Sequence, residues 1–581
     1  MRILGIVCDT HDTGVAVLEE GLPALVLEEE RLNREKHTQK FPHLSLEAAF
    51  SQLKLGIGDI DVITTPWDTR ELRRTFTKAV LGHLPSSLAL LWPGAHAAQD
   101  SGIVLLTLWL KLELRRRLGI ARLPSVVQVG HHDAHAAIFF VSPFEEAAVL
   151  VMDGYGDVSA TSAYVGCGNR LECCWRGKFF DSLGMLYTLV THHLGFKTFE
   201  EGTVMALAAY GGGTYVAKFR DVVHLQEGGQ FSLNRDYLRH DRYGEMRPFT
   251  RKFLETFGPP RDRDEPVGDR HRDLAYALQT TIEETVVHVV RGLSAAHSSR
   301  NLCLTGGVAL NCVANTRILS DTDYQRVWVP PCASDTGAPL GSALWHYHQT
   351  LAHARRTVLT HPFYGIAYGD GEIRSALDRA GLSYQRLGDH ELVAVVARSI
   401  AEGRIVGWFQ GRFEMGPRAL GNRSILADAR DPQMKDRLNA RIKQREPFRP
   451  FAPVVLAEHA AEFFEIDQTD PFMTMAPRVR TDKAHLIPAA VHVDGTARIQ
   501  TVDRSANPRY YRLIEEFARR TGIPIILNTS FNHREPIVAS PADAVACYLR
   551  TGMDLLVLGD FVAVRPASGG IGENIKEYAT A

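Results

Sequence analysis

Three histidines and an aspartate fall within five residues of the stretch VGHHDAHAAIFF. In a helix, residues four apart share a face, so His131 and His135 can direct two imidazoles at one point while His132 turns away. This spacing is typical of metal ligands, and the alternative interpretation is that the histidines pack or cap the helix. We expect His132 to be structural, and Asp133 to lie on the helix surface or behind the ligands.

Two imidazoles do not complete a metal site, so further ligands must come from distant parts of the chain. The carboxylates best placed by context are Asp153, at the end of a predicted strand, and Asp335, in the turn PPCASDTGAPLG. A set of two nitrogens and two oxygens suits ferrous iron or zinc. His11 lies beside Asp12 in an early turn, and a neighbouring carboxylate keeps an imidazole basic and oriented, so His11 is a candidate general base; a turn histidine without a role is the alternative.

The elements that must position these residues follow a repeated pattern. An apolar strand, a turn and a returning strand open the chain, and the same order recurs from Ala147. Paired hairpins of this kind can hold the phosphates of a nucleotide, which predicts an internal duplication. In RNLCLTGGVALN, Gly306 and Gly307 permit close backbone approach before a helix start, where a nucleotide could bind; a plain strand-to-helix turn is the alternative.

The segment of the sequence richest in arginine runs from Phe409 to Pro453. Its arginines alternate with Gly, Pro and Phe, which favours a rigid pocket for phosphate oxyanions over a solvated helix face. The candidate anion ligands are Arg418, Arg423, Lys443, Arg445 and Arg449. Farther on, the polar residues that could bind a base, ribose or phosphate are Arg498, Asn528, Thr529 and Ser530. The alternative for the last three is a capped strand terminus.

Bulk composition limits the class of protein. At 581 residues the chain predicts two or more domains, with a boundary between residues 350 and 370. A net charge of −2 gives no general attraction for nucleic acid or an acidic membrane. The eight scattered cysteines, the absence of an export signal and an apolar stretch interrupted at Lys111 lead us to expect a cytoplasmic protein that does not span a membrane.

Several motifs then occur in an order that is specific. They include HDTGVAVLEEG, LEEERLNREKH, HHDAHAA, VLVMDGYGD, EEGTVMALAAYG, LTGGVALN, GPRALGNRSILADAR, REPFRPFAP, HVDGTARIQ and LNTSFNHREPIV. Together they resemble the NodU/CmcH family of O-carbamoyltransferases, of the tobramycin carbamoyltransferase type. The resemblance covers nearly the whole chain.

This resemblance implies an α/β protein of two parts. Residues 1–355 would form an actin-like ATPase fold similar to the tRNA threonylcarbamoyl transferase, and residues 356–581 a YrdC-like α/β domain. The second part would make carbamoyl-adenylate from carbamoyl phosphate and ATP with magnesium. The first would pass the carbamoyl group to a hydroxyl of a small-molecule acceptor, such as a sugar or an antibiotic precursor.

The resemblance also implies residue roles. The Fe²⁺ ligands, with zinc as the alternative metal, would be His131, His135, Asp153 and Asp335. The catalytic groups would be His11, Lys443 and Arg418. The substrate and nucleotide ligands that it implies would be Arg449, Arg498, Asn528 and Ser530; the motifs themselves add the candidates Asp12, Gly306, Gly307, Asn311, Arg423 and Thr529. Two departures from the family pattern are Thr203, where a lysine is common, and Ser334, where a second acid is common.

Other functions remain open at this point. One is an actin-fold phosphotransferase resembling sugar kinases, and another is a nucleotide-binding regulatory protein without turnover. Modification of tRNA or of a hydrogenase-maturation partner is disfavoured by the neutral charge. We expect carbamoyl phosphate, ATP and an alcohol as partners, with no nucleic acid and no membrane; a homodimer is left open. The acceptor pocket should come from segments near residues 82–100 and 235–260.

Overall fold

The computed structural model describes the chain except for residues 9, 93–105, 120–121, 356 and 565–581. It divides into two compact units. The first comprises Met1–Glu30 and His37–Leu359, and the second comprises Arg31–Lys36 and Thr360–Ala581. Residue 356, at which the sequence predicts the second domain to begin, lies outside the described residues. The sequence gives no sign that six residues near its start belong to the second unit.

The first unit contains a five-stranded sheet in the order β3-β2-β1-β4-β5. Its strands are β1 (Arg2–Val7), β2 (Gly14–Glu19), β3 (Leu22–Glu28), β4 (Val62–Thr65) and β5 (Ser125–Gln128). The central strand β1 is antiparallel to β2 and parallel to β4. All but one residue of β1 is buried, as expected for a central strand covered on both faces.

A second five-stranded sheet repeats this topology in the order β8-β7-β6-β11-β12. Its strands are β6 (Glu146–Met152), β7 (Thr161–Cys167), β8 (Arg170–Arg176), β11 (Asn301–Thr305) and β12 (Arg326–Trp328). Here β6 is antiparallel to β7 and parallel to β11, as β1 is to β2 and β4. The first unit is therefore a duplicated, actin-like fold. This architecture agrees with the predicted fold class, and the internal duplication is confirmed.

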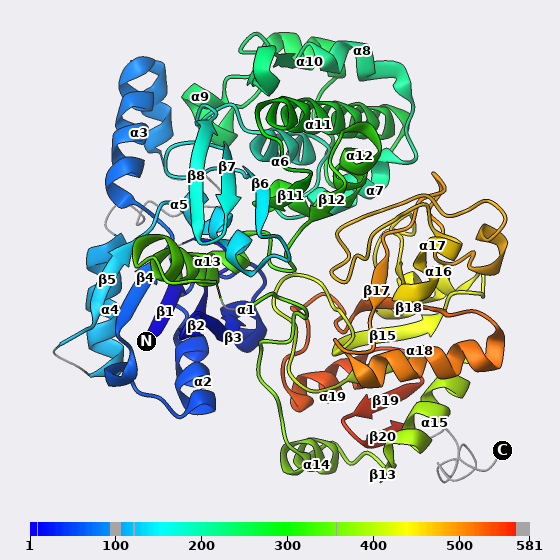
Figure 1. Cartoon of the computed structure of the whole chain (residues 1–581). Coiled ribbons are helices and arrows are strands. Elements are labelled where there is room, and N and C mark those ends of the chain that lie inside the picture. Colours follow the sequence, from blue (N-terminus) through cyan, green and yellow to red (C-terminus); the bar gives the residue numbers. More distant parts are fainter. Residues whose placement is uncertain (9, 93–105, 120–121, 356, 565–581) are drawn as a thin grey trace. The chain divides into compact units, whose positions relative to one another are not determined.

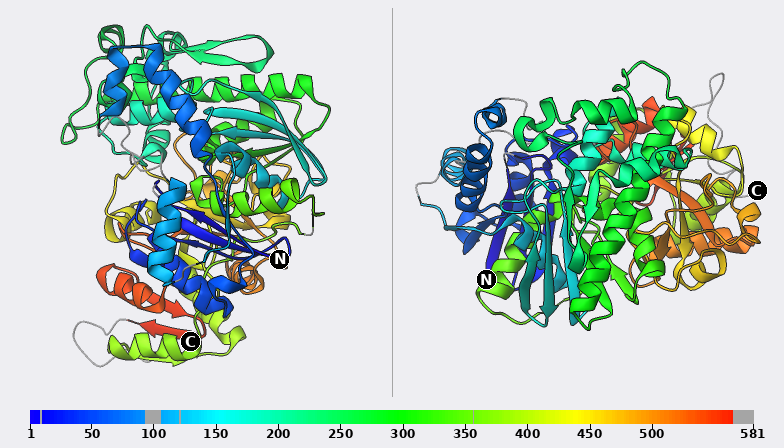
Figure 2. Two further views of the ribbon diagram at one scale, coloured as in Figure 1. Left: turned by 90° about the vertical axis from the view of Figure 1, so that its left-hand side faces the viewer. Right: turned by 90° about the horizontal axis from the view of Figure 1, so that it is seen from above.

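Helices and a small hairpin complete the first unit. The helices that belong to the first half are α2 (His43–Leu53), α3 (Thr69–Gly82), α4 (Leu106–Leu118) and α5 (His131–Ala136), whereas α1 (Glu29–Asn33) begins in the first unit and ends in the residues assigned to the second. Those of the second half are α6 (Leu183–His193), α7 (Glu201–Ala208), α8 (Val216–Arg220), α9 (His240–Tyr243), α10 (Arg251–Phe257), α11 (Asp269–Ala296), α12 (Cys312–Asp321) and α13 (Ala338–Leu344). The long helix α11 packs against α7 and α12, beside the second sheet (Figures 1 and 2). The hairpin pairs β9 (Val223–Leu225) with β10 (Phe231–Leu233).

Glycines let α13 approach both β1 and α5 closely (Figure 1). A Cβ atom on Gly5 of β1 would lie 1.9 Å from the carbonyl oxygen of Pro339 in α13. A Cβ atom on Gly341 of α13 would lie 2.0 Å from the carbonyl oxygen of Ala134 in α5. Only glycine permits such backbone contacts. This close packing brings the turn that precedes α13 next to α5.

The second unit is built on a mixed eight-stranded sheet, in the order β13-β20-β19-β14-β15-β18-β16-β17. Its strands are β13 (Tyr384–Arg386), β14 (Val406–Phe409), β15 (Arg423–Asp428), β16 (Ala452–Leu456), β17 (Gln500–Val502), β18 (Ile525–Ser530), β19 (Leu555–Leu558) and β20 (Phe561–Val564). Its helices are α14 (Asp370–Arg379), α15 (Asp389–Ala401), α16 (Met434–Arg437), α17 (Ala460–Phe463), α18 (Pro508–Thr521) and α19 (Pro541–Arg550). Sequence signals set the ends of α18: Asn507 caps it, and Gly522 ends it in a left-handed conformation.

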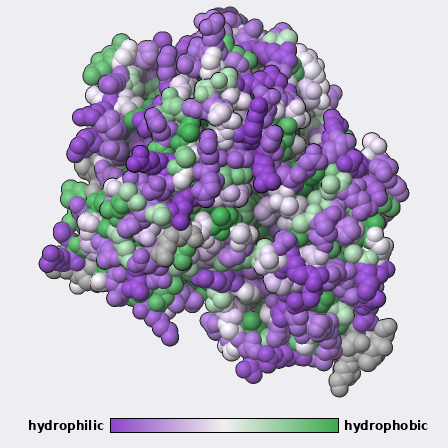
Figure 3. Space-filling view, viewed as in Figure 1, coloured by the Kyte–Doolittle hydropathy of each residue, from purple (hydrophilic) through white to green (hydrophobic). Residues whose placement is uncertain are grey.

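Among the described residues, no helix is long and apolar enough to cross a bilayer. The face drawn in Figure 3 is mainly hydrophilic, with apolar residues in small separate patches.

Candidate active site

Four side chains predicted from the sequence as metal ligands meet in the first unit. The Nε2 atoms of His131 and His135 are 3.2 Å apart. Each lies between 3.1 and 3.4 Å from Oδ2 of Asp153 and Oδ1 of Asp335. Around a metal with ligand atoms at about 2.0–2.1 Å, neighbouring donors of a tetrahedral site are about 3.3 Å apart. The distances from the two imidazole nitrogens to each other and to both carboxylates therefore match such a site, and all four donor atoms lie within 4.8 Å of one another.

Surrounding groups set which imidazole nitrogens face the cluster. Nδ1 of His131 lies 3.2 Å from the carbonyl oxygen of Pro66, to which it can donate, so that Nε2 is left as the ligand. The ring of His131 also stacks on Trp67, with centroids 4.0 Å apart. His132, by contrast, bonds to the hydroxyl of Ser162 at 2.8 Å and takes no part in the cluster. Asp133 accepts a hydrogen bond from Tyr164.

The electrostatics of this metal-ligand cluster match a cation site. Burial lowers the pKa of His131, but the charges of Asp335 and Asp153 raise it overall to about 10. The imidazoles in turn hold the pKa of Asp153 and of Asp335 below the usual range, against the effect of burial. The two carboxylates are thus ionised, and protonated imidazoles compensate their negative charge. A divalent cation can supply this compensating positive charge in place of the two protons.

His11 stands beside this cluster. Its Nε2 atom lies 3.8 Å from Oδ2 of Asp335, and its Nδ1 atom lies 3.0 Å from Oδ2 of Asp12. The other oxygen of Asp12 is 2.7 Å from Nδ1 of His37. Phe199 stacks on His37, with centroids 3.8 Å apart, and meets His11 edge-on. Asp12 is therefore held between two imidazoles, and it fixes the ring of His11.

The sequence did not predict His37, Phe199 or Trp67 as part of this site. The one signal for His37 is its place at the end of the motif LEEERLNREKH. Phe199 has a positive φ of 69°, which is unusual for a residue with a side chain and marks a constrained position. His37 also donates its backbone N–H to Glu30, and ligand atoms of Asp12, Glu30 and His37 lie within 4.8 Å of one another.

The glycine pair lies next to Asp153. Gly306 has a φ of 89°, and a Cβ atom there would lie 2.2 Å from the carbonyl oxygen of Met152, so no other residue fits. The N–H of Gly307 points to Oδ1 of Asp153 at 3.3 Å. Asn311, the third predicted nucleotide ligand of this motif, uses its side chain to cap α12. The turn thus contacts directly a carboxylate that the sequence predicts as a metal ligand.

Several positively charged side chains lie close together in the second unit. Burial and the nearby charges of Arg445, Lys36 and Arg449 lower the pKa of Lys443 well below its usual value. Burial together with Arg449 and Arg498 also lowers the pKa of Arg445. Neighbouring positive charges lower one another's pKa in this way where few carboxylates neutralise them. This cationic cluster is therefore suited to a polyanion.

Lys443 ends a π-helical turn, Leu438–Lys443, and its ammonium is held in place. The Nζ atom lies within 3.1 Å of four acceptors, namely the backbone carbonyl and side-chain oxygens of Ser530 and of Asn532. Ser530 is the last residue of β18, where the sequence predicts polar ligands, and Thr529 precedes it. The lysine therefore fixes the end of β18.

Two other predicted ligands hold the loop between β14 and β15. The guanidinium of Arg423 is fully buried, donates to the carbonyls of Gln410, Asn422 and Gly411, and lies 3.5 Å over the ring of Phe409. Asn528 donates to the carbonyl of Ala419 at 3.0 Å. Arg418, next to Ala419, is half-buried. Arg423 and Asn528 thus position the loop that carries Arg418, a structural role that the sequence did not predict.

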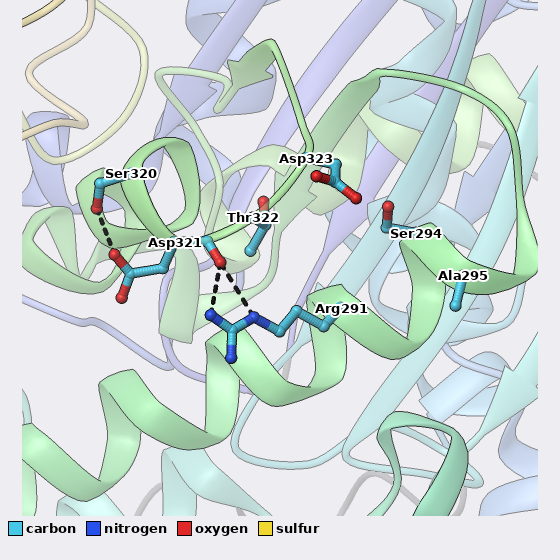
Figure 4. Close-up of a pocket in the computed structure, with 7 residues that line it drawn as sticks. All are labelled: Arg291, Ser294, Ala295, Ser320, Asp321, Thr322 and Asp323. Carbon is cyan, nitrogen blue, oxygen red and sulfur yellow. Dashed lines mark hydrogen bonds between the residues drawn. The ribbon is translucent and has the colours of Figure 1, made fainter.

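A surface pocket lies elsewhere in the first unit, between α11 and the end of α12 (Figure 4). Arg291 donates to the carbonyl oxygen of Asp321 through Nε and Nη2, at 3.0 and 2.8 Å. The remaining lining residues are Ser294, Ala295, Ser320, Thr322 and Asp323. None of the predicted site residues lines it.

Comparison with known proteins gave matches over most of the chain. The family model described as carbamoyltransferase N-terminus matches residues 2–344, and carbamoyltransferase C-terminus matches residues 397–565. A Synechocystis protein is 37% identical over 97% of both chains. Nodulation protein NolNO of Sinorhizobium fredii is 38% identical over 95% of this chain and 78% of its own. Among solved structures, full-length HypF in its phosphate- and nucleotide-bound form matches 61% of this chain and 56% of its own, at 12% identity and a TM-score of 0.32.

Proposed function

This chain belongs to the carbamoyltransferase family, and we propose that it is an ATP-dependent O-carbamoyltransferase. It would take a carbamoyl group from carbamoyl phosphate, through carbamoyl-adenylate, to a hydroxyl of a small-molecule acceptor. The observation that supports this proposal best is the meeting of His131, His135, Asp153 and Asp335, with His11 beside them.

Activation of the carbamoyl group belongs to the second unit in this proposal. For carbamoyl-adenylate to form, water first releases phosphate from carbamoyl phosphate, and an oxygen of the resulting carbamate then attacks the α-phosphate of ATP, from which pyrophosphate leaves. Both reactants are polyanions, so they repel each other until cations neutralise them. Lys443, Arg445, Arg449 and Arg498 supply that charge. We assign Arg418, on the loop held by Arg423, to the same reactants, and magnesium to the ATP phosphates.

Transfer belongs to the first unit. His11 takes the proton of the acceptor hydroxyl, whose oxygen then attacks the carbamoyl carbon while AMP leaves. Asp12 holds the ring of His11 in the orientation for this step and stabilises its protonated form. A divalent cation, Fe²⁺ or alternatively Zn²⁺, would supply positive charge that polarises the carbamoyl oxygen and offsets the carboxylates that raise the pKa of His11.

The test is mass spectrometry of candidate alcohols after incubation with the protein, carbamoyl phosphate, ATP, magnesium and ferrous iron. We expect a mass gain of one carbamoyl group, with AMP, phosphate and pyrophosphate as co-products. Formation of ADP together with a phosphorylated alcohol would instead identify a phosphotransferase.

A further inference from the structure

Asp157 lies in the loop between β6 and β7, four residues after Asp153, and its side chain is buried. A single oxygen, Oδ2, accepts two backbone hydrogen bonds, from the N–H of His131 at 3.0 Å and from that of Asp68 at 3.2 Å. His131 is the first residue of α5, and Asp68 is the N-cap of α3. The carboxylate thus joins the starts of two helices of the first unit, both labelled in Figure 1.

The helix α5 needs this carboxylate because it has no side-chain cap of its own. Its N-cap is Gly130, which makes no side-chain hydrogen bond, and the first N–H groups of a helix find no partner within the helix. A hydrogen bond from an N–H group to a carboxylate is stronger than one to a neutral acceptor. Asp157 therefore supplies, from another loop, the cap that Gly130 lacks, and it fixes the peptide group of His131.

The second hydrogen bond of Asp157 holds the segment that contacts the ring of His131. Asp68 directly follows Pro66 and Trp67 in the sequence. The carbonyl oxygen of Pro66 lies 3.2 Å from Nδ1 of His131, and the buried ring of Trp67 stacks on the imidazole with centroids 4.0 Å apart. One carboxylate therefore anchors both the backbone of His131 and the residues that orient its imidazole.

The loop that carries Asp157 also carries Asp153, one of the predicted metal ligands. A backbone hydrogen bond of 2.9 Å, from the N–H of Asp153 to the carbonyl oxygen of Ala160, closes this loop and limits the separation of Asp153 and Asp157. Oδ2 of Asp153 lies 3.3 Å from Nε2 of His131. The bond between Asp157 and the start of α5 thus helps to set the distance between two ligands from different segments.

We propose that Asp157 is a positioning residue of the metal-ligand cluster, which orients His131 toward a divalent cation without contacting the cation itself. This inference rests on the metal site of the proposed function. A ligand that is already held in place loses less conformational entropy on binding, so an unanchored His131 should bind the cation more weakly. A group that only stabilised the fold would change the melting temperature and leave metal affinity unaltered.

The test compares binding of Co²⁺ to the full-length wild type and to Asp157→Ala, by calorimetric titration and by the visible absorption of the bound ion, which reports its coordination geometry. We expect the Kd for Co²⁺ to rise about 10–100-fold in Asp157→Ala, and the spectrum at saturation to change. Asp157→Asn should show a smaller loss, because its amide oxygen can still accept from the N–H of His131 although it carries no charge.

Unchanged affinity and spectrum in folded Asp157→Ala would overturn the proposal. Should that variant not fold, judged by thermal melting, the same result in Asp157→Asn would overturn it.

Asp273→Ala is the matched control, because Asp273 also joins distant segments of the first unit through two hydrogen bonds. It accepts from the N–H of Gly212 at 2.8 Å and from the hydroxyl of Thr214. We expect Asp273→Ala to lower Tm but to leave the Kd and the spectrum of Co²⁺ unchanged. If it weakened Co²⁺ binding as much as Asp157→Ala, loss of stability would explain both effects and the positioning role would be excluded.

Carbamoyl transfer separates this inference from the proposed function. If the wild type carbamoylates an alcohol while Asp157→Ala binds Co²⁺ as the wild type does, the function stands and the positioning role fails. If Co²⁺ binding depends on Asp157 but no alcohol gains a carbamoyl group, the function fails and the positioning role stands. Absence of Co²⁺ binding by the wild type would overturn the metal site and the positioning role together.

Discussion

Nε2 of His135 and Oδ1 of Asp335 lie 3.2 Å apart although 200 residues separate them in the sequence. The contact exists because α13 lies against α5, where Gly341 faces the carbonyl oxygen of Ala134. A side chain at residue 341 would push α13 away and move Asp335 with it. The meeting of these predicted metal ligands therefore depends on the packing of two helices as much as on the ligands themselves.

We expect His131→Ala to lose bound metal and to reduce carbamoyl transfer at least about 100-fold, because one of four ligands is missing. Consumption of carbamoyl phosphate and ATP should continue. Metal content is measured by mass spectrometry, and the two reactions by product analysis. His132→Asn is the matched control: it should lower Tm, since it loses packing beside Ser162, but keep its metal. Loss of both reactions in folded His131→Ala would contradict separate sites.

Lys443→Ala should stop adenylate formation, with pyrophosphate release falling at least about 100-fold, because the cationic cluster loses a charge and the end of β18 loses its anchor. Arg418→Ala should act in the same direction. Lys435→Ala, on the nearby α16, is the control and should leave pyrophosphate release unchanged. Normal pyrophosphate release by Lys443→Ala would count against the assignment.

Arg423→Met should lower the stability of the protein. The substitution leaves the buried carbonyl group of Gln410 without its guanidinium donor, breaks the hydrogen bond to Gly411 and removes the contact with Phe409. We expect a loss of roughly 2–4 kcal/mol in the free energy of unfolding, measured by denaturant titration. A variant of full stability that has lost only nucleotide binding would show instead that Arg423 is a direct ligand.

The pair of His11 and Asp12 should make the stability of metal-free protein depend on pH. Burial lowers the pKa of His11, but the hydrogen bond to Asp12 and the charge of Asp335 raise it overall from 6.5 to about 9. Protonated His11 therefore stabilises the fold fully below pH 6.5, and this contribution is lost as the pH rises through 9. The difference in Tm between the wild type and His11→Gln, measured in a chelator, should shrink by about 2–4 °C over this range. A constant difference up to pH 9.5 would exclude this coupling.

Local geometry explains what could be predicted from the sequence. Because helix periodicity places residues i and i+4 on one face, the spacing of His131 and His135 was enough to predict that they face one point. The alternation of apolar strands and turns predicted the two hairpins and their duplication. Asn507 and Gly522 similarly mark the ends of α18, because capping depends on a few adjacent residues.

Tertiary packing decided the rest. No local signal predicts that Lys443 bonds to Ser530, that Arg423 lies over Phe409, or that His37 holds Asp12, since these contacts depend on which side chains fill the space between distant segments. The sequence alone therefore determined the types of chemical group and their local facing. Only the folded chain decided which arginines and lysines hold the backbone and which imidazoles share a carboxylate, because burial and long-range contact set those partners.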